Sequence, residues 1–140
     1  MPKLTLEQAT RIAQQAFAEG AQRSVVNMSC VVTDAGGHLR LAMRADGQGI
    51  FGIETATAKA VSSLGFGRST LLLMPNFDAG AVAAINGATR GRFAPLGGGV
   101  VIVDADDEPI GAVGLSGGLP AVDDEIARAA LGVCGQRCRH

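Results

Sequence analysis

The fold is decided by residues 97–124, GGGVVIVDADDEPIGAVGLSGGLPAVDD, which hold seven of the chain's twenty glycines. Two apolar runs within this stretch, residues 100–103 and 110–115, are typical of strands, and the acidic segment between them favours a turn. The strands therefore form a hairpin that brings its two glycine clusters, 97–99 and 114–118, to the same end. Glycine lets other groups approach the backbone closely. This end is thus either a binding site or a place of tight turns and close packing.

The stretch resembles the closing signature of the GlcG/HbpS-like family, which includes haem-binding proteins and the C-terminal domain of PduO-type corrinoid proteins. HLRLAMRADG at 38–47 and ETATAKA at 54–60 extend the resemblance, which covers residues 4–131. The resemblance implies a central antiparallel sheet flanked by helices, and a bound haem or corrinoid. It does not specify a reaction, because members of the family are functionally diverse.

The remaining chain predicts helices and one further hairpin. Thr5 and Gln8 form a capping box at the start of a helix that extends to about residue 23. Strands are expected at 28–33 and 38–45, joined by a turn that begins at Asp34, and helices at 50–64, 80–88 and 122–135. Leu39 is expected on the buried face of the second strand. Asp123 is expected in the first turn of the last helix, where the helix dipole favours negative charge. The two hairpins, VVTDAGGHLRL and VIVDADDEPIGAV, look alike, which hints at an internal repeat. The order helix, hairpin, helices, hairpin, helix indicates a single α+β domain over residues 1–140, built on a central antiparallel sheet.

The composition of the chain indicates which kinds of partner the protein can have. Charged residues make up only 18% of the chain and hydrophobic residues 47%, which predicts apolar surface for a homo-oligomer. A net charge of -1 and the absence of Trp and Tyr argue against nucleic acid. No apolar run approaches the ~20 residues of a membrane span, and the N-terminal segment lacks a signal-peptide core, so a cytoplasmic location is expected. Cys134 and Cys138 are expected on one face of the last helix.

Arg44, Asp46 and Lys59 are the strongest candidates for a charged site. Lys59 lies on an Ala- and Thr-rich helix, and a buried ammonium needs a carboxylate partner or a ligand. One interpretation is an ion pair between Lys59 and Asp46 that joins strand and helix. The other is an anion-binding pocket in which Arg44 acts as a bidentate donor and the glycine amides lie behind it. The second interpretation predicts a ligand site made of Arg44, Asp46, Lys59, Gly97, Gly98, Gly99, Gly114, Ser116 and Gly117.

His38 follows directly after a predicted turn. Its side chain is either solvated or caps the turn, or it is an axial ligand to haem iron. It is better placed for the second role than the other histidine, His140, which is the last residue of the chain. The sequence contains no recognisable metal-binding motif or catalytic triad.

Two function classes remain open. The first is a small-molecule-binding module for haem or a related tetrapyrrole, accessory to a catabolic pathway. The second is a cofactor-independent enzyme of the isomerase, tautomerase or hydratase/lyase type, acting on a carboxylate-bearing metabolite with Lys59, Asp46 and Arg44 as catalytic residues. An interaction subunit without a ligand is the third possibility.

Overall fold

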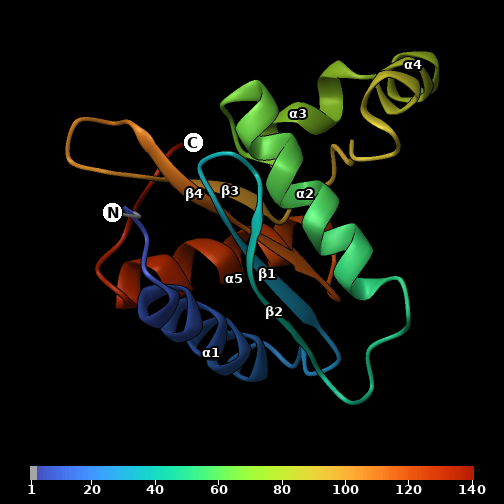
Figure 1. The fold of residues 1–140 in the computed structure, drawn as a ribbon. Helices are drawn as coiled ribbons and strands as arrows, with labels where there is room; N and C mark the ends of the chain where they lie inside the picture. Colours follow the sequence, from blue (N-terminus) through green and yellow to red (C-terminus); the bar gives the residue numbers. More distant parts are fainter. Residues whose placement is uncertain (1–2) are drawn as a thin grey trace.

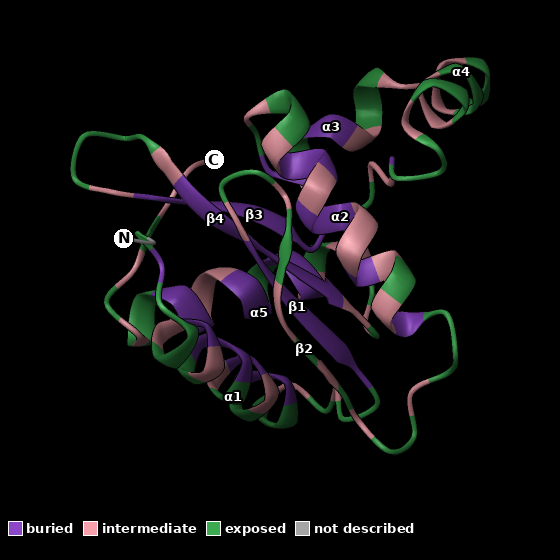
Figure 2. Cartoon of the chain, viewed as in Figure 1, coloured by how far each residue is buried: buried purple, intermediate pink, exposed green. Residues whose placement is uncertain are grey.

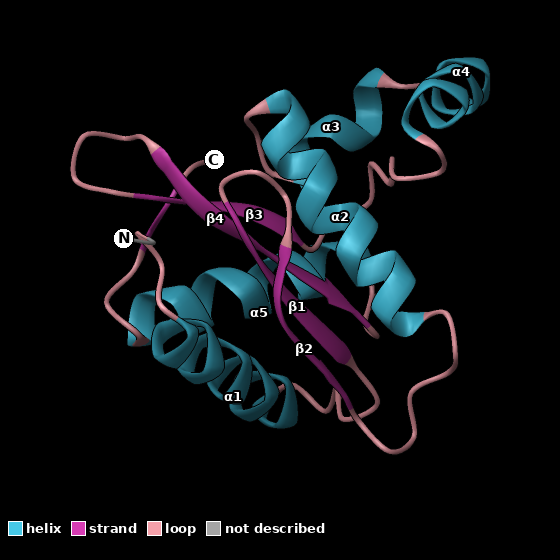
Figure 3. Cartoon of the chain, in the orientation of Figure 1, coloured by secondary structure: helices cyan, strands magenta, loops and turns pink. Residues whose placement is uncertain are grey.

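The computed structural model describes residues 3–140 (Figure 1). Its elements alternate as the sequence predicts, so the α+β order of helix, hairpin, helices, hairpin and helix is confirmed (Figure 3). In chain order they are α1 (Leu6–Gln22), β1 (Ser29–Asp34), β2 (Leu39–Arg44), α2 (Gly52–Phe66), α3 (Thr70–Leu73), the 3-10 turn η1 (Met74–Asn76), α4 (Ala79–Thr89), β3 (Gly99–Val103), β4 (Pro109–Ser116), α5 (Pro120–Val133) and β5 (Arg137–Cys138).

The strands form one sheet in the order β2-β1-β4-β3-β5, and every neighbouring pair is antiparallel. The two predicted hairpins are β1–β2 and β3–β4. They are joined by the pairing of β1 with β4, in which Ser29 lies opposite Ser116. Within the second hairpin Gly99 lies opposite Gly114, so both glycine clusters lie at the same end, as predicted. The two-residue strand β5 was not predicted from the sequence.

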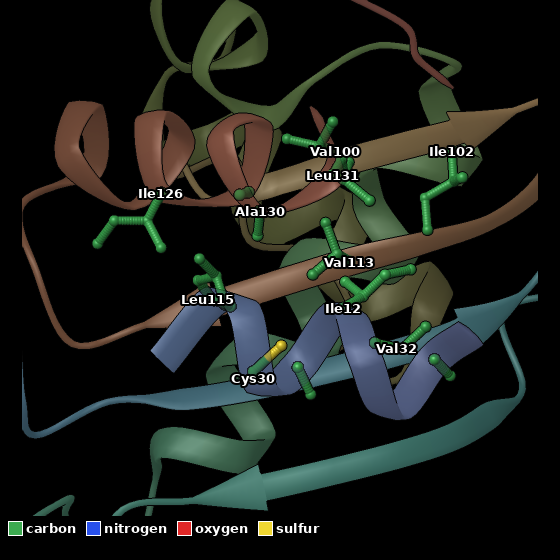
Figure 4. Close-up of a cluster of buried hydrophobic side chains, with 14 of the residues drawn as sticks. Ile12, Cys30, Val32, Val100, Ile102, Val113, Leu115, Ile126, Ala130 and Leu131 are labelled. Atoms are coloured by element: carbon green, nitrogen blue, oxygen red, sulfur yellow. The ribbon is translucent and has the colours of Figure 1, made fainter. Parts of the chain in front are cut away.

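Helices cover both faces of the sheet (Figure 1). α1 and α5 pack side by side on one face, and α2 lies across the other. Alternation along the strands separates the two faces, so Cys30 and Val32 of β1 point toward α1 and α5 while Val31 points toward α2. The main core fills the space between the sheet and the α1–α5 layer, where Ile12, Leu115, Ile126 and Leu131 are fully buried (Figure 4).

α2 lies directly on the strands because two glycines provide the room. A Cβ atom at Gly114 would overlap the carbonyl oxygen of Ala56, and one at Gly99 would overlap that of Lys59. Gly98, directly before Gly99 in the chain, has a φ of +128°, which residues other than glycine rarely adopt. The glycine clusters therefore serve close packing of a helix against a sheet.

The turns of the two hairpins use the same hydrogen bonds. Asp34 Oδ1 accepts from the backbone N–H groups of Gly36 and His38, both at 2.9 Å. Asp104 Oδ1 accepts from Asp106 at 2.9 Å and from Glu108 at 3.0 Å, at the same spacing along the chain. Each turn also follows a register irregularity in its hairpin. The likeness of the two hairpins in sequence thus extends to their turn geometry.

Two expectations about where side chains lie are wrong. Cys134 and Cys138 do not share a helical face, because α5 ends at Val133 and Cys138 lies in β5. Leu39 was expected on the buried face of β2, but it is 59% exposed because β2 forms the edge of the sheet. Within residues 3–140, no helix is both long and apolar enough to cross a bilayer.

Candidate functional site

Lys59 points from α2 into the protein interior. Its Nζ donates to the carbonyl oxygen of Leu115 at 2.7 Å and lies 3.1 Å from Asp123 Oδ2. The Lys59 side chain is 5% exposed and that of Asp123 is 1% exposed. The expected carboxylate partner is therefore present, but the prediction of Asp46 is wrong. Asp46 lies exposed after β2, whereas Asp123 lies in the first turn of α5, directly against Lys59.

The buried ion pair has no unsatisfied charge. The second carboxylate oxygen, Asp123 Oδ1, accepts from the backbone N–H of Gly118 at 2.9 Å. Burial raises the pKa of the Asp123 carboxyl above its usual value, and the Lys59 ammonium opposes that shift. The pair fixes α2 to the β4–α5 connection. Its charges are already bound by protein groups, so the enzyme alternative is not favoured.

Two of the glycine amides proposed as ligand donors are used inside the protein. The N–H of Gly97 donates to Met74 Sδ at 3.3 Å, and that of Gly99 donates to Thr70 Oγ1 at 2.8 Å. A Cβ at Gly117 would lie 2.7 Å from the carbonyl oxygen of Asn27, so the second cluster is equally close-packed. This end of the hairpin is filled by neighbouring chain segments.

The charged residues of the RADG segment lie apart from Lys59. Arg44 is exposed at the end of β2, and its guanidinium donates to the carbonyl oxygen of Gln48 at 2.9 Å. Asp46 is exposed in the following loop. None of the hydrogen bonds or ion pairs of Lys59 within the described chain involves either residue. The nine predicted site residues therefore do not form the single pocket that the anion-binding interpretation requires.

His38 is placed differently, at the exposed tip of the first hairpin. Its side chain is 83% exposed, and its Nδ1 lies 3.3 Å from Asp34 Oδ1. Hydrogen bonds from the backbone N–H groups of His38 and Gly36, together with the His38 charge when present, lower the pKa of the Asp34 carboxyl. Because Nδ1 faces the carboxylate, the other ring nitrogen, Nε2, is directed away from it. Within residues 3–140, Nε2 has no hydrogen-bond partner, so the imidazole presents one free nitrogen at the surface.

Two hollows flank the turn that carries His38, and Ala35 and Gly36 line both. One has a volume of about 290 Å³ and is lined by Lys3, Leu4, Asp34, Ala35, Gly36, Arg40 and Ile110. The other, of about 300 Å³ between the turn and α2, is lined by Ala35, Gly36, Gly37, Val61, Leu64, Gly65 and Arg92. Each hollow thus combines apolar groups with at least one cation. Arg40 is notable because its Nε is buried without a hydrogen-bond partner among the described residues.

A third hollow lies away from His38, at the base of α4. It has a volume of about 350 Å³ and is mostly apolar, with Met74, Phe77, Val82, Phe93, Ala94, Pro95 and Leu96 in its walls. Met74 is the group there that could ligate iron, but its sulfur already accepts a hydrogen bond from Gly97. Among residues 3–140, no three His, Cys, Asp or Glu side chains are grouped so as to hold a metal ion.

Sequence reasoning missed two residues that determine this geometry. Asp123 was interpreted only as an acidic residue in the first turn of a helix, and its contact with Lys59 joins positions 64 apart in sequence. Asp34 was interpreted only as a turn residue. The sequence signal for the hydrogen bonds of Asp34 was that Asp104 occupies the equivalent position in the second hairpin. His38 of the first hairpin has no such counterpart, because Glu108 occupies its position in the second.

Comparisons with known proteins agree on the fold. A family model described as "Haem degrading protein HbpS-like" matches residues 4–132. HbpS from Streptomyces reticuli, in a double-mutant form, is 27% identical over 93% of this chain and 86% of that chain, with a TM-score of 0.78. The protein ORFY from Klebsiella pneumoniae is 26% identical over 94% and 90% of the two chains, with a TM-score of 0.83.

A PduOC:heme complex shares the fold with a TM-score of 0.86, at 22% identity over 98% of this chain and 99% of that one. No curated protein matches the chain.

Proposed function

The chain belongs to the HbpS-like family, and from this membership we propose that it is a haem-binding module in which His38 is the axial ligand. The ligand class comes from the relatives. The family description names haem, and the similar PduOC structure is a haem complex. The histidines of this chain that could ligate iron are His38 and His140.

One observation carries the assignment of His38. Histidines that bind metals nearly always donate the other ring N–H to a carboxylate or carbonyl, which fixes the tautomer and the ring orientation. Asp34 stands in that position, 3.3 Å from His38 Nδ1. The carboxylate is itself fixed by two backbone N–H groups, which hold it beside the ring. The pair leaves Nε2 exposed for iron.

His38 itself lines neither of the two hollows, but both lie beside its turn and carry charged and apolar groups of the kind that contact haem. Haem carries two propionate carboxylates, and Lys3, Arg40 and Arg92 supply cations on the two sides of the turn. The apolar groups Val61 and Leu64 of α2 provide contact for the edge of the porphyrin. Each hollow lies at the lower end of the ~300–1,000 Å³ usual for ligand pockets, so it holds the edge of a flat ring rather than the whole of it. When bound, haem supplies a redox-active iron.

A corrinoid is the alternative ligand to haem, because the family resemblance includes PduO-type corrinoid proteins. An accessory role in a catabolic pathway also belongs to this proposal and follows from the resemblance alone. His38 could ligate cobalt as well as iron, so the ligand must be distinguished by competition rather than by the site residues.

Titration with haem tests the proposal. The chain contains no Trp or Tyr, so its own near-ultraviolet absorption is weak and a bound tetrapyrrole dominates the spectrum. We expect a saturable titration with a sharpened Soret band. Broad absorption that rises without saturation would contradict haem binding. A parallel titration with aquocobalamin, and its competition against haem, decides between the two tetrapyrroles.

A further inference from the structure

A register irregularity in β2 directs Arg40 to the opposite side of the sheet from the one that strand alternation would give it. Leu39 and Leu41 lie opposite consecutive residues of β1, so Arg40 between them has no partner across the pair. Leu41 packs against the main core, and strict alternation would place Arg40 on the α2 side. Arg40 instead lines a hollow of about 290 Å³ together with Leu4, which belongs to that core. Bulges frequently re-aim a side chain next to a binding site.

The second hairpin has the same irregularity and contributes to the same hollow, which we call the Arg40 hollow. Pro109 and Gly111 lie opposite consecutive residues of β3, so Ile110 between them has no partner. Ile110 follows the turn aspartate of its hairpin by six residues, as Arg40 does in the first hairpin. Figure 2 shows that the two turns, residues 35–37 and 105–107, are exposed or partly exposed, whereas β1, β3 and β4 are largely buried. Equivalent positions of the two hairpins thus direct one cation and one apolar side chain to one place near the surface.

The guanidinium of Arg40 has no anion beside it. Its Nε is buried without a hydrogen-bond partner, and none of the ion pairs within residues 3–140 includes Arg40. The carboxylate of Asp34 also lines the hollow, but its Oδ1 is bound by the backbone N–H groups of Gly36 and His38. A buried donor of a charged group is unfavourable without an acceptor. The unpaired Nε therefore indicates an acceptor that a ligand supplies.

The other walls of the Arg40 hollow indicate which kind of anion it accepts. Lys3 adds a second cation, whose Nζ lies 3.7 Å from Asp104 Oδ2. Leu4 and Ile110 are only 1% and 8% exposed, so the hollow also has apolar walls. A guanidinium binds a carboxylate through two parallel hydrogen bonds. Apolar walls favour a carboxylate on a hydrocarbon chain over a compact ion such as phosphate.

We propose that the Arg40 hollow binds the carboxylate of a short aliphatic acid, with Arg40 as the principal donor and Lys3 as the second cation. Its volume is at the lower end of the ~300–1,000 Å³ usual for ligand pockets, so it holds a short chain and not a ring system. The carboxylate has two sources, a propionate side chain of haem or a free aliphatic acid. The first source rests on the proposed function, because it requires haem at His38. The second is independent of haem.

Titration of the isotope-labelled protein with sodium propionate tests the site without haem. At an ionic strength held constant with NaCl, we expect saturable changes in the amide NMR shifts of Gly36 and Ile110. Arg40→Gln should abolish these changes. Arg44→Gln is the matched control, because Arg44 lies on the same strand but is exposed, and its guanidinium is bound to the carbonyl oxygen of Gln48. This control should titrate as the wild type does. Inorganic phosphate at the same concentrations should give no saturable change.

Haem and its dimethyl ester distinguish the two sources of the carboxylate. The ester lacks the propionate charges but keeps the iron and the porphyrin. If a propionate occupies the hollow, Arg40→Gln should raise the dissociation constant of haem about tenfold and leave that of the ester unchanged. Arg40→Lys keeps the charge without the bidentate geometry, so its haem affinity should lie between those of wild type and Arg40→Gln. If the site takes a free acid, Arg40→Gln abolishes the propionate titration and leaves the affinity for haem at the wild-type value.

Two results would overturn the proposal. The first is a propionate response that Arg40→Gln leaves unchanged. The second is a wild type without a saturable propionate response, in which Arg40→Gln also affects haem and ester equally. The proposed function fails separately from this site. A protein that binds propionate through Arg40 but gives no saturable haem titration would contradict haem binding and leave the carboxylate site standing.

Discussion

The ammonium of Lys59 lies 3.1 Å from Asp123 Oδ2, and both side chains are almost completely buried. Replacing Lys59 with Met leaves the Asp123 carboxyl buried without its cation. Breaking a buried pair in this way costs about 3–5 kcal/mol. We therefore expect the free energy of unfolding in urea to fall by about that amount.

The control is the double variant Lys59→Met with Asp123→Leu, which removes both charges and should recover much of the loss. The anion-pocket interpretation makes the opposite prediction. It would be supported by a Lys59→Met protein that unfolds at the wild-type urea concentration but no longer binds haem.

Gly114→Ala tests the close contact between α2 and the sheet. The new methyl group would overlap the carbonyl oxygen of Ala56, so the helix has to move away from the strands. We expect a destabilisation of about 1–3 kcal/mol or more, typical of overpacking. Gly132→Ala in α5 is the matched control, because its Cβ meets nothing within 4 Å. That change should stabilise the helix by about 0.5–1 kcal/mol. Equal effects at both positions would contradict the packing role.

The loss of folding stability at low pH should depend on Asp34 and Asp104, the aspartates of the two hairpin turns. Backbone hydrogen bonds, from His38 to Asp34 and from Glu108 to Asp104, are the main cause that lowers the pKa of each carboxyl in the folded protein. A carboxyl with a lowered folded pKa stabilises the fold above its unfolded pKa of about 3.9, and this stabilisation is lost as pH falls through the folded pKa.

We therefore expect Asp104→Asn to be less stable than wild type at neutral pH, with the difference shrinking as pH falls below about 4. Urea unfolding at a series of pH values measures this. Asp106→Asn, in the same turn but with an exposed carboxylate, serves as the control. Parallel stability curves for wild type and Asp104→Asn would rule out the linkage.

Asp34 should also affect the affinity for haem, because it contacts His38. Loss of the carboxylate that orients a ligating imidazole typically weakens metal binding about 10–100-fold. Asp34→Asn is therefore expected to raise the haem dissociation constant by that factor, as measured by Soret titration. Asp104→Asn is the matched control, because it makes the same change in the equivalent turn of the hairpin that has no histidine. Equal effects of the two variants would remove Asp34 from the site.

The sequence predicted those parts of the fold in which periodicity and turn chemistry act locally. The capping box of Thr5 and Gln8 begins α1 as predicted, and the Asp turns close both hairpins. β5 was missed because two residues cannot show a strand pattern, and its pairing depends on where α5 ends. The small-residue helix α4 was predicted, but its separation from the body is a tertiary property.

The candidate site was harder to predict for the same reason. Lys59 was correctly interpreted as a lysine that needs a carboxylate, but local sequence could not show that Asp123 is closer in space than Asp46. The glycines drew attention as ligand donors, whereas Gly99 and Gly114 are required because α2 crosses the strands there. His38 stays a prediction that its geometry supports.

The Soret spectrum of haem-loaded His38→Ala tests the central claim most directly. The side chain is 83% exposed, so its removal should leave the fold intact, which circular dichroism checks. His140→Ala is the control, because it removes the only other histidine. The account predicts a shifted Soret band and weakened haem binding for His38→Ala, with a wild-type spectrum for His140→Ala. An unchanged band in His38→Ala would contradict the account and assign the iron to another side chain.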